Sequence, residues 1–155
     1  MFFLLSNVEA VKFLVSQNVS IQTEGVPDSE SVLVHAVQMD GPDMLEALLK
    51  SPGINVNVRS EAGWPVFFEA MRRHGYEVAE KLLAAGADPN TMSSNQLHTA
   101  LLIATFEEWP DIVRLLVRYG ADVNLENCHR ENPLTTAVCR GKLPCIICFI
   151  EDAFD

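Results

Sequence analysis

Residues Val78–Asn90 read V-A-E-K-L-L-A-A-G-A-D-P-N, and further along the chain Ile112–Asn124 read I-V-R-L-L-V-R-Y-G-A-D-V-N. Self-similarity at a fixed period of about 20–50 residues is typical of proteins built from stacked repeats. In the first copy Val78, Leu82 and Leu83 are spaced so that they fall on one face of a helix. The stretch therefore predicts a short amphipathic helix, a stop and a turn, repeated along the chain.

The residue that ends each predicted helix recurs along the whole chain at a nearly constant spacing. It is Asn18, Gly53, Gly86 and Gly120 in turn. Glycine, and less often asparagine, adopts the left-handed backbone conformation with which helices commonly end. The apolar helices predicted before these residues span Val8–Gln17, Asp43–Ser51, Tyr76–Ala85 and Asp111–Tyr119.

A second, shorter helix is expected before each long one from the second repeat onwards. Ser31, Thr99 and Asn132 are suitable N-cap residues for it, and Pro133 suits the first helical position. Pro65 stands where the third repeat should have its cap, which predicts a weaker helix start there. Each short helix carries an alanine that allows close packing, at Ala36, Ala70, Ala104 and Ala137.

These motifs resemble the ankyrin repeat, whose pattern includes T-P-L-H-x-A at a helix start and G-A-D-V-N after the second helix. Residues 86–90 (G-A-D-P-N) and 120–124 (G-A-D-V-N) match closely. Residues 99–104 (T-A-L-L-I-A) and 132–137 (N-P-L-T-T-A) match in part. The resemblance implies an all-α ankyrin-repeat solenoid, made of helix–turn–helix repeats with short β-turn fingers.

The resemblance covers essentially the whole chain, which is expected to form one domain over residues 1–155. Three full repeats are assigned to residues 24–56, 57–90 and 91–124, between partial repeats at 1–23 and 125–155. The histidine of the family motif is absent, since its place holds Val34, Phe68, Leu102 or Thr135. The repeats are therefore expected to be less regular than the family consensus.

Composition and charge exclude several kinds of partner. The chain has 155 residues, 48% apolar and 21% charged, with a formal net charge of −10. No basic stripe is available to neutralise phosphates, so we expect no nucleic-acid binding, and an acidic surface also disfavours anionic membranes. No apolar run reaches the length of about 18 residues that spans a bilayer. Residues 1–5 (M-F-F-L-L) lack the basic flank of a signal peptide, which favours the cytoplasm or nucleus.

No catalytic, metal or cofactor site is expected. The four cysteines all lie between Cys128 and Cys148, unlike a disulfide framework. Cys145 and Cys148, with His129, have spacing that a zinc site could use, but their places in the repeat are buried, which favours core packing. The acidic residues lack a predicted pocket that would perturb them. We therefore predict that the chain is not an enzyme.

By resemblance, the expected function is to bind another protein through the concave face of the repeats. Trp64 and Phe106 are the main candidates, because exposed aromatic residues favour interface hot spots, although each could instead pack locally. The full set of candidate partner-binding residues, taken by register, is Met39, Trp64, Arg72, Arg73, His98, Phe106, Glu107 and Arg140.

Two alternatives stay open. One is a small inhibitor of a kinase or a transcription factor. The other is a ligand-sensing module of a larger multidomain protein. Ile147 and Ile150 fall in a final helix with no following repeat to cover it, so further repeats or self-association at the C-terminal end is also open.

Overall fold

The computed structural model describes Phe13, Gln17 and residues 32–38, 42–51, 53–95 and 97–151. Two compact units make up the chain, unit 1 (Met1–Ala87) and unit 2 (Asp88–Asp155). The helices of unit 1 are α3 (Val32–Gln38), α4 (Pro42–Leu49) and α5 (Val66–Ala84). Those of unit 2 are α6 (Ala100–Phe106), α7 (Pro110–Arg118), α8 (Pro133–Cys139) and α9 (Leu143–Glu151).

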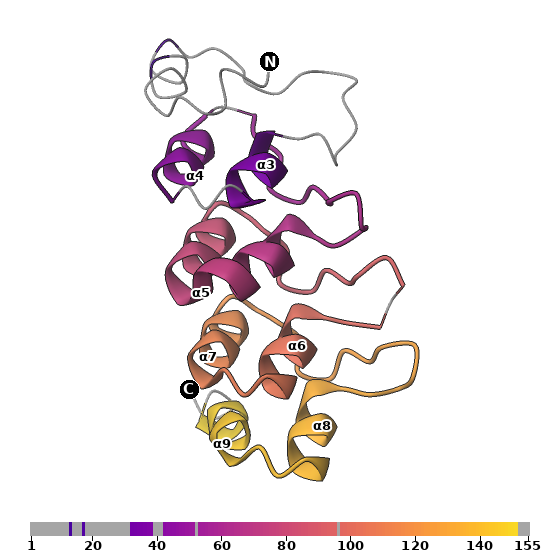
Figure 1. The fold of residues 1–155 in the computed structure, drawn as a ribbon. Helices are drawn as coiled ribbons and strands as arrows, with labels where there is room; N and C mark the ends of the chain where they lie inside the picture. The colour runs from indigo at the N-terminus through magenta and orange to yellow at the C-terminus, as the bar shows by residue number, and fades with distance from the viewer. Residues whose placement is uncertain are drawn as a thin grey trace. The chain divides into compact units, whose positions relative to one another are not determined.

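Unit 2 consists of two helix pairs. Helix α6 packs beside α7 and α8 beside α9, while α6 also contacts α8 and α7 contacts α9 (Figure 1). Ala104 and Ala137 are completely buried in the two short helices, and Leu115 and Leu116 fill the core from α7. The small alanine side chains let the helices approach closely, as predicted.

Local capping explains where the short helices begin. The Thr99 hydroxyl oxygen accepts a hydrogen bond of 3.0 Å from the Leu102 amide, and Asn132 Oδ1 accepts one of 2.8 Å from the Thr135 amide. Pro65 precedes α5 without a side-chain cap, as its sequence predicts. The predicted cap at Ser31 lies outside the described residues.

The predicted helix ends are confirmed wherever the structure describes them. Gly53, Gly86 and Gly120 have φ values of 77°, 94° and 85°, in the left-handed region. Asn18 lies outside the described residues. Gly75, with φ 70° and ψ −149°, kinks α5, so the helix predicted over Tyr76–Ala85 is the second half of α5.

An asparagine at the end of the turn joins one repeat to the next within each unit: Asn57 in unit 1 and Asn90, of the G-A-D-P-N motif, in unit 2. Asn57 Nδ2 donates to the Gly86 carbonyl oxygen at 3.3 Å in unit 1. In unit 2, Asn90 Nδ2 donates to the Gly120 carbonyl oxygen at 3.1 Å, and Asn90 Oδ1 accepts from the Asp122 amide at 2.8 Å. These bonds satisfy the carbonyl at the end of the following repeat's helix.

The fingers are short turns closed by isolated antiparallel bridges, Arg59 with Pro65 and Met92 with Thr99. Two residues other than glycine have a left-handed backbone in the described part of the chain. They are Glu108, at φ 60°, between α6 and α7, and Arg130, at φ 59°, in the finger before α8. Such a conformation costs about 1–2 kcal/mol for a residue that carries a Cβ.

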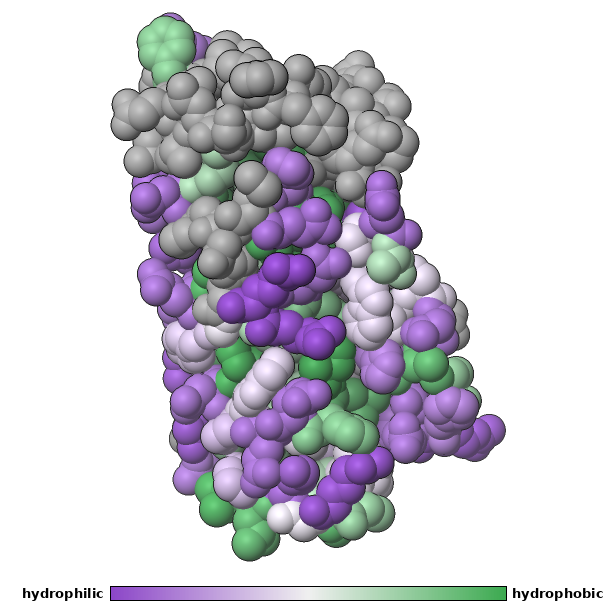
Figure 2. Space-filling model, viewed as in Figure 1, coloured by the Kyte–Doolittle hydropathy of each residue, from purple (hydrophilic) through white to green (hydrophobic). Residues whose placement is uncertain are grey.

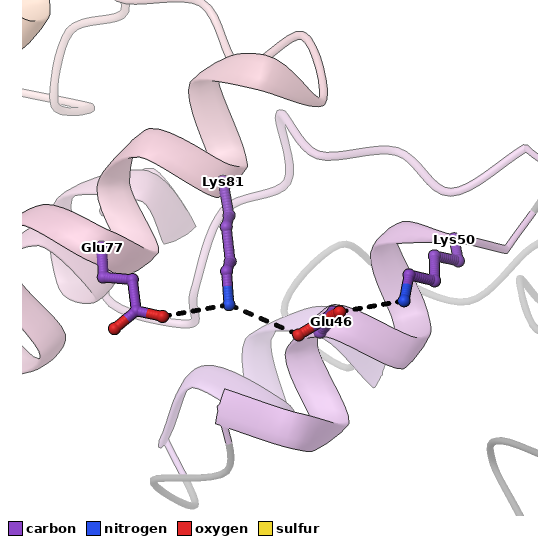
Figure 3. Close-up of polar contacts among 4 residues, drawn as sticks. All are labelled: Glu46, Lys50, Glu77 and Lys81. Carbon is purple, nitrogen blue, oxygen red and sulfur yellow. Dashed lines mark hydrogen bonds and ion pairs between the residues drawn. The ribbon is translucent and has the colours of Figure 1, made fainter.

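An ionic cluster joins α4 to α5 in unit 1 (Figure 3). Lys81 Nζ lies 3.4 Å from Glu46 Oε2 and 3.3 Å from Glu77 Oε1, and Lys50 Nζ lies 2.9 Å from Glu46 Oε1. Hydrogen bonds and charge attraction from Lys50, and then from Lys81, lower the pKa of Glu46. A hydrogen bond to Glu77 and the interactions with Glu46 raise the pKa of Lys81, against the opposing effect of desolvation.

Apolar side chains gather at the α8/α9 end of unit 2 (Figure 2). Val138, Leu143, Ile147 and Ile150 are between 50% and 66% exposed. Among the described residues, Ile147 and Ile150 are therefore exposed on α9, as expected. None of the helices in the described part of the chain combines the length and the apolar character needed to cross a membrane.

Candidate functional site

A hollow of about 230 Å³ opens in unit 2 between α6, α8 and the two fingers that precede them. Most of its lining is apolar, and the polar groups come mainly from the fingers. The residues that line it are Leu97, His98, Leu102, Ile103, Phe106, Glu107, Asn127, Glu131 and Thr136. A concave, largely apolar surface with a few polar groups is the usual form of a binding site.

Phe106, the last residue of α6, forms an exposed aromatic wall of this hollow. Its side chain is 49% exposed. The guanidinium carbon of Arg140, which caps the C-terminal end of α8, lies 3.9 Å from the centre of the Phe106 ring. This distance is well within the range of a cation–π interaction. The stacked pair fixes both side chains at the rim without burying either.

Asn127 holds the finger that supplies the other wall. Its Nδ2 donates to the Leu97 carbonyl oxygen at 3.0 Å and to Glu131 Oε2 at 2.9 Å. Its Oδ1 accepts from the amides of His129 and Glu131 at 2.9 Å and 3.0 Å. Because Asn127 is buried and uses both ends of its amide, it sets the position of the Glu131 carboxylate.

His98 is half-buried and enters the hollow from the finger before α6. Its backbone is fixed by Ser93, whose amide donates to the His98 carbonyl oxygen at 2.9 Å and whose hydroxyl accepts from the His98 amide at 3.1 Å. The imidazole therefore projects from a turn that two hydrogen bonds hold together.

The charged groups of the hollow are acidic. Glu107 and Glu131 are both exposed, and no lysine or arginine is among the lining residues. Within the described residues, neither carboxylate forms an ion pair. The hollow consequently combines an apolar floor with two carboxylates that no basic group in its lining balances.

Four of the predicted site residues thus come together in unit 2: His98, Phe106, Glu107 and Arg140. Sequence reasoning omitted Asn127, whose role depends on bonds to both neighbouring segments. The sequence pattern that could have indicated this role is an asparagine at a finger turn followed four positions later by an acidic residue.

The other four predicted residues belong to unit 1, and the structure describes three of them. Trp64 is half-buried, and its ring lies 6.0 Å from that of the buried Phe68, at an interplanar angle of 54°. Local packing therefore accounts for part of the Trp64 surface, which was the alternative considered for it. Arg72 and Arg73 are exposed on the first half of α5. Met39 lies outside the described residues.

The cysteine pair of α9 packs in the core. Cys145 and Cys148 are both fully buried, which confirms the expected packing role, and burial raises the pKa of the Cys145 thiol. His129 is exposed on its finger. No three histidine, cysteine or acidic side chains of the described residues are grouped as a metal ion would require.

A family model and several curated proteins match this sequence. A family model described as "Ankyrin repeats (3 copies)" matches residues 67–155. The chain is 31% identical over 105 residues to E3 ubiquitin-protein ligase KEG of Arabidopsis thaliana, which covers 64% of this chain and 6% of that protein. It is 41% identical over 70 residues to Ankyrin repeat and SOCS box protein 6 of Mus musculus, covering 44% of this chain and 17% of that protein.

Among solved structures, the ankyrin repeat domain of Bcl-3 superposes with a TM-score of 0.77 at 24% identity. The match covers 95% of this chain and 65% of that one. The predicted all-α ankyrin-repeat fold is thereby confirmed. The chain spans only a small fraction of the two curated relatives, 6% and 17% of their lengths.

Proposed function

Because this chain belongs to the ankyrin-repeat family, whose domains are non-enzymatic modules that generally mediate protein–protein interaction, we propose that it binds a protein partner through the concave hollow of unit 2. The observation that carries the proposal is the stacked pair of Phe106 and Arg140 beside an apolar hollow. Aromatic and arginine side chains in such a setting are the residue types that dominate binding energy at interfaces.

The rim and floor of the hollow have separate tasks in this proposal. Phe106 supplies apolar contact area, and its stacking with Arg140 means that little side-chain freedom is lost on binding. His98 and Glu107 provide polar contacts at the edge. In unit 1, Trp64, Arg72 and Arg73 are proposed as additional partner contacts on that unit's own surface. A partner in the cytoplasm or nucleus is expected.

A selection from a displayed random-peptide library tests this proposal. Wild-type protein should recover peptides that bind the hollow, and Phe106→Ala should weaken those peptides about 30-fold, the equivalent of about 2 kcal/mol. Dissociation constants are measured by titration calorimetry. The matched control is Tyr119→Ala, which truncates an aromatic residue of similar exposure at the end of α7.

Both variants should retain the wild-type unfolding midpoint, because each side chain is substantially exposed. Peptides that bind Phe106→Ala and wild type equally well would show that the hollow is not the binding surface. Equal weakening by both variants would indicate a nonspecific effect and would contradict the proposal as well.

A further inference from the structure

We infer that the hollow of unit 2 receives a basic side chain, lysine or arginine, of the protein partner. The inference rests on the proposed function and specifies the chemistry of what is bound. It depends on three features of the hollow: its floor, its two carboxylates and the exposed aromatic ring.

The floor suits the aliphatic part of a long basic side chain. Leu102 and Ile103 of α6 line it, with Leu97 on the finger and Phe106 at the end of the helix. Lysine and arginine bury their methylene groups on apolar surface while their charged ends stay among polar groups. A volume of about 230 Å³ offers room for one such side chain.

The two carboxylates supply the charge that a basic group requires. Glu107 follows α6, and Glu131 precedes α8, so the hollow has an acidic group on each of the two repeats that form it. Asn127 donates to only one oxygen of Glu131, Oε2, and neutralises no charge. A lysine or arginine placed between them would gain charge-assisted hydrogen bonds that the free protein does not make.

The ring of Phe106 already binds a guanidinium group within the protein. Arg140 lies 3.9 Å from its centre, although Arg140 is not among the residues that line the hollow. The geometry shows that this ring accepts a cation at its face. The net charge of −10 acts in the same direction at longer range, because it attracts basic partners and speeds their association.

Charge variants of the hollow provide the test. The same random-peptide library is selected on wild-type protein, and we expect the recovered sequences to be enriched in lysine and arginine. For the strongest such peptide, Glu107→Gln and Glu131→Gln should each weaken binding about tenfold. Replacing the enriched basic residue of that peptide by norleucine should have a similar effect.

Asp111→Asn is the matched control. It removes one exposed carboxylate of unit 2 from α7, outside the hollow, and should change the affinity less than about twofold. The variant Glu107→Lys should abolish the enrichment of basic peptides, because its lysine offsets the charge of Glu131.

The outcomes separate this inference from the proposed function. Peptides that depend on Phe106 but show no basic enrichment, or that bind Glu107→Gln and Glu131→Gln as well as wild type, would overturn the inference and leave the hollow as the binding site. Peptides that bind without depending on Phe106 would overturn both. A loss in Asp111→Asn equal to that in Glu107→Gln would assign the effect to overall charge and refute the specific contact.

Discussion

Arg130 and Gly63 occupy the same turn position in two fingers, one in each unit. The Gly63 amide donates to the Ser60 carbonyl oxygen at 2.8 Å, and the Arg130 amide donates to the Asn127 carbonyl oxygen at 2.9 Å. Their φ values are 75° and 59°. Glycine adopts this conformation readily, whereas arginine is strained in it because of its Cβ.

Arg130→Gly should therefore stabilise the protein by about 0.5–1 kcal/mol, the relief of strain less the larger entropy of an unfolded glycine. The exposed side chain of Arg130 makes no hydrogen bond or ion pair with the described residues, so its loss removes nothing else. Urea unfolding measures the change. Gly63→Ala is the reciprocal substitution and should destabilise; a stabilising effect there would contradict this account of the turn.

Sequence reasoning at the residue scale succeeded where a side chain acts on its own backbone. The caps at Thr99 and Asn132 and the left-handed Gly86 and Gly120 follow from local preferences, and all four are confirmed. Arg130 could not be found in this way, because an arginine gives no local signal of a left-handed turn.

At the scale of elements, the ionic cluster connects α4 with α5. Glu46 has a lower pKa in the folded protein than in the unfolded chain. Its contribution to the free energy of unfolding is therefore fully present above the pKa that it has in the unfolded chain, and it is lost as the pH falls through its pKa in the folded protein. The pKa of Lys81 is raised, so its contribution is present below the unfolded pKa of the amine and is lost as the pH rises through the folded one.

Lys50→Met should raise the pKa of Glu46 toward its ordinary value, since Lys50 is the largest cause of the shift. The side-chain carboxyl carbon of Glu46 can be followed by NMR as a function of pH. Lys142→Met is the control, because Lys142 pairs with Glu108 in unit 2. An unchanged pKa of Glu46 in Lys50→Met would show that the contact does not persist in solution.

Helix positions were predictable from sequence because the spacing of apolar residues and the residues that end a helix are local signals. The helix predicted over Asp111–Tyr119 corresponds to α7, Pro110–Arg118, within one residue at each end. The short and the long helix expected in this repeat meet at Gly75, whose non-helical backbone forms the kink inside α5.

At the scale of the whole molecule, hydrogen bonds from Asn57 and Asn90 connect successive repeats within each unit. Asn90→Ala removes two hydrogen bonds to the following repeat and should destabilise the protein by about 1–2 kcal/mol. Asn124→Ala is a close control, because Asn124 has the same place in its motif, while its side chain forms no hydrogen bond within the described part of the chain. Equal losses in the two variants, measured by urea unfolding, would show that the bridging bonds contribute nothing.

The hollow itself was only partly predictable. Its residues could be named from register, but Phe106 and Arg140 belong to successive repeats, and their stacking depends on how α8 packs against α6. The anchoring of Glu131 by Asn127 likewise depends on a contact with Leu97 in the preceding finger. Such pairings follow from the spacing between repeats rather than from any local preference.

The bonds of Asn57 and Asn90 also have a consequence for how such a gene can change. Each asparagine donates to the carbonyl oxygen of a glycine that lies 29 or 30 residues ahead. That glycine ends the second helix of the next repeat, so the spacing of the bond follows the length of one repeat. An in-frame duplication or deletion of a complete repeat preserves the spacing between such an asparagine and the glycine that it reaches. An insertion of a few codons between Asn90 and Gly120 changes the spacing between the two bonded residues. During evolution, changes in the number of repeats should therefore be tolerated more readily than changes in the length of one repeat.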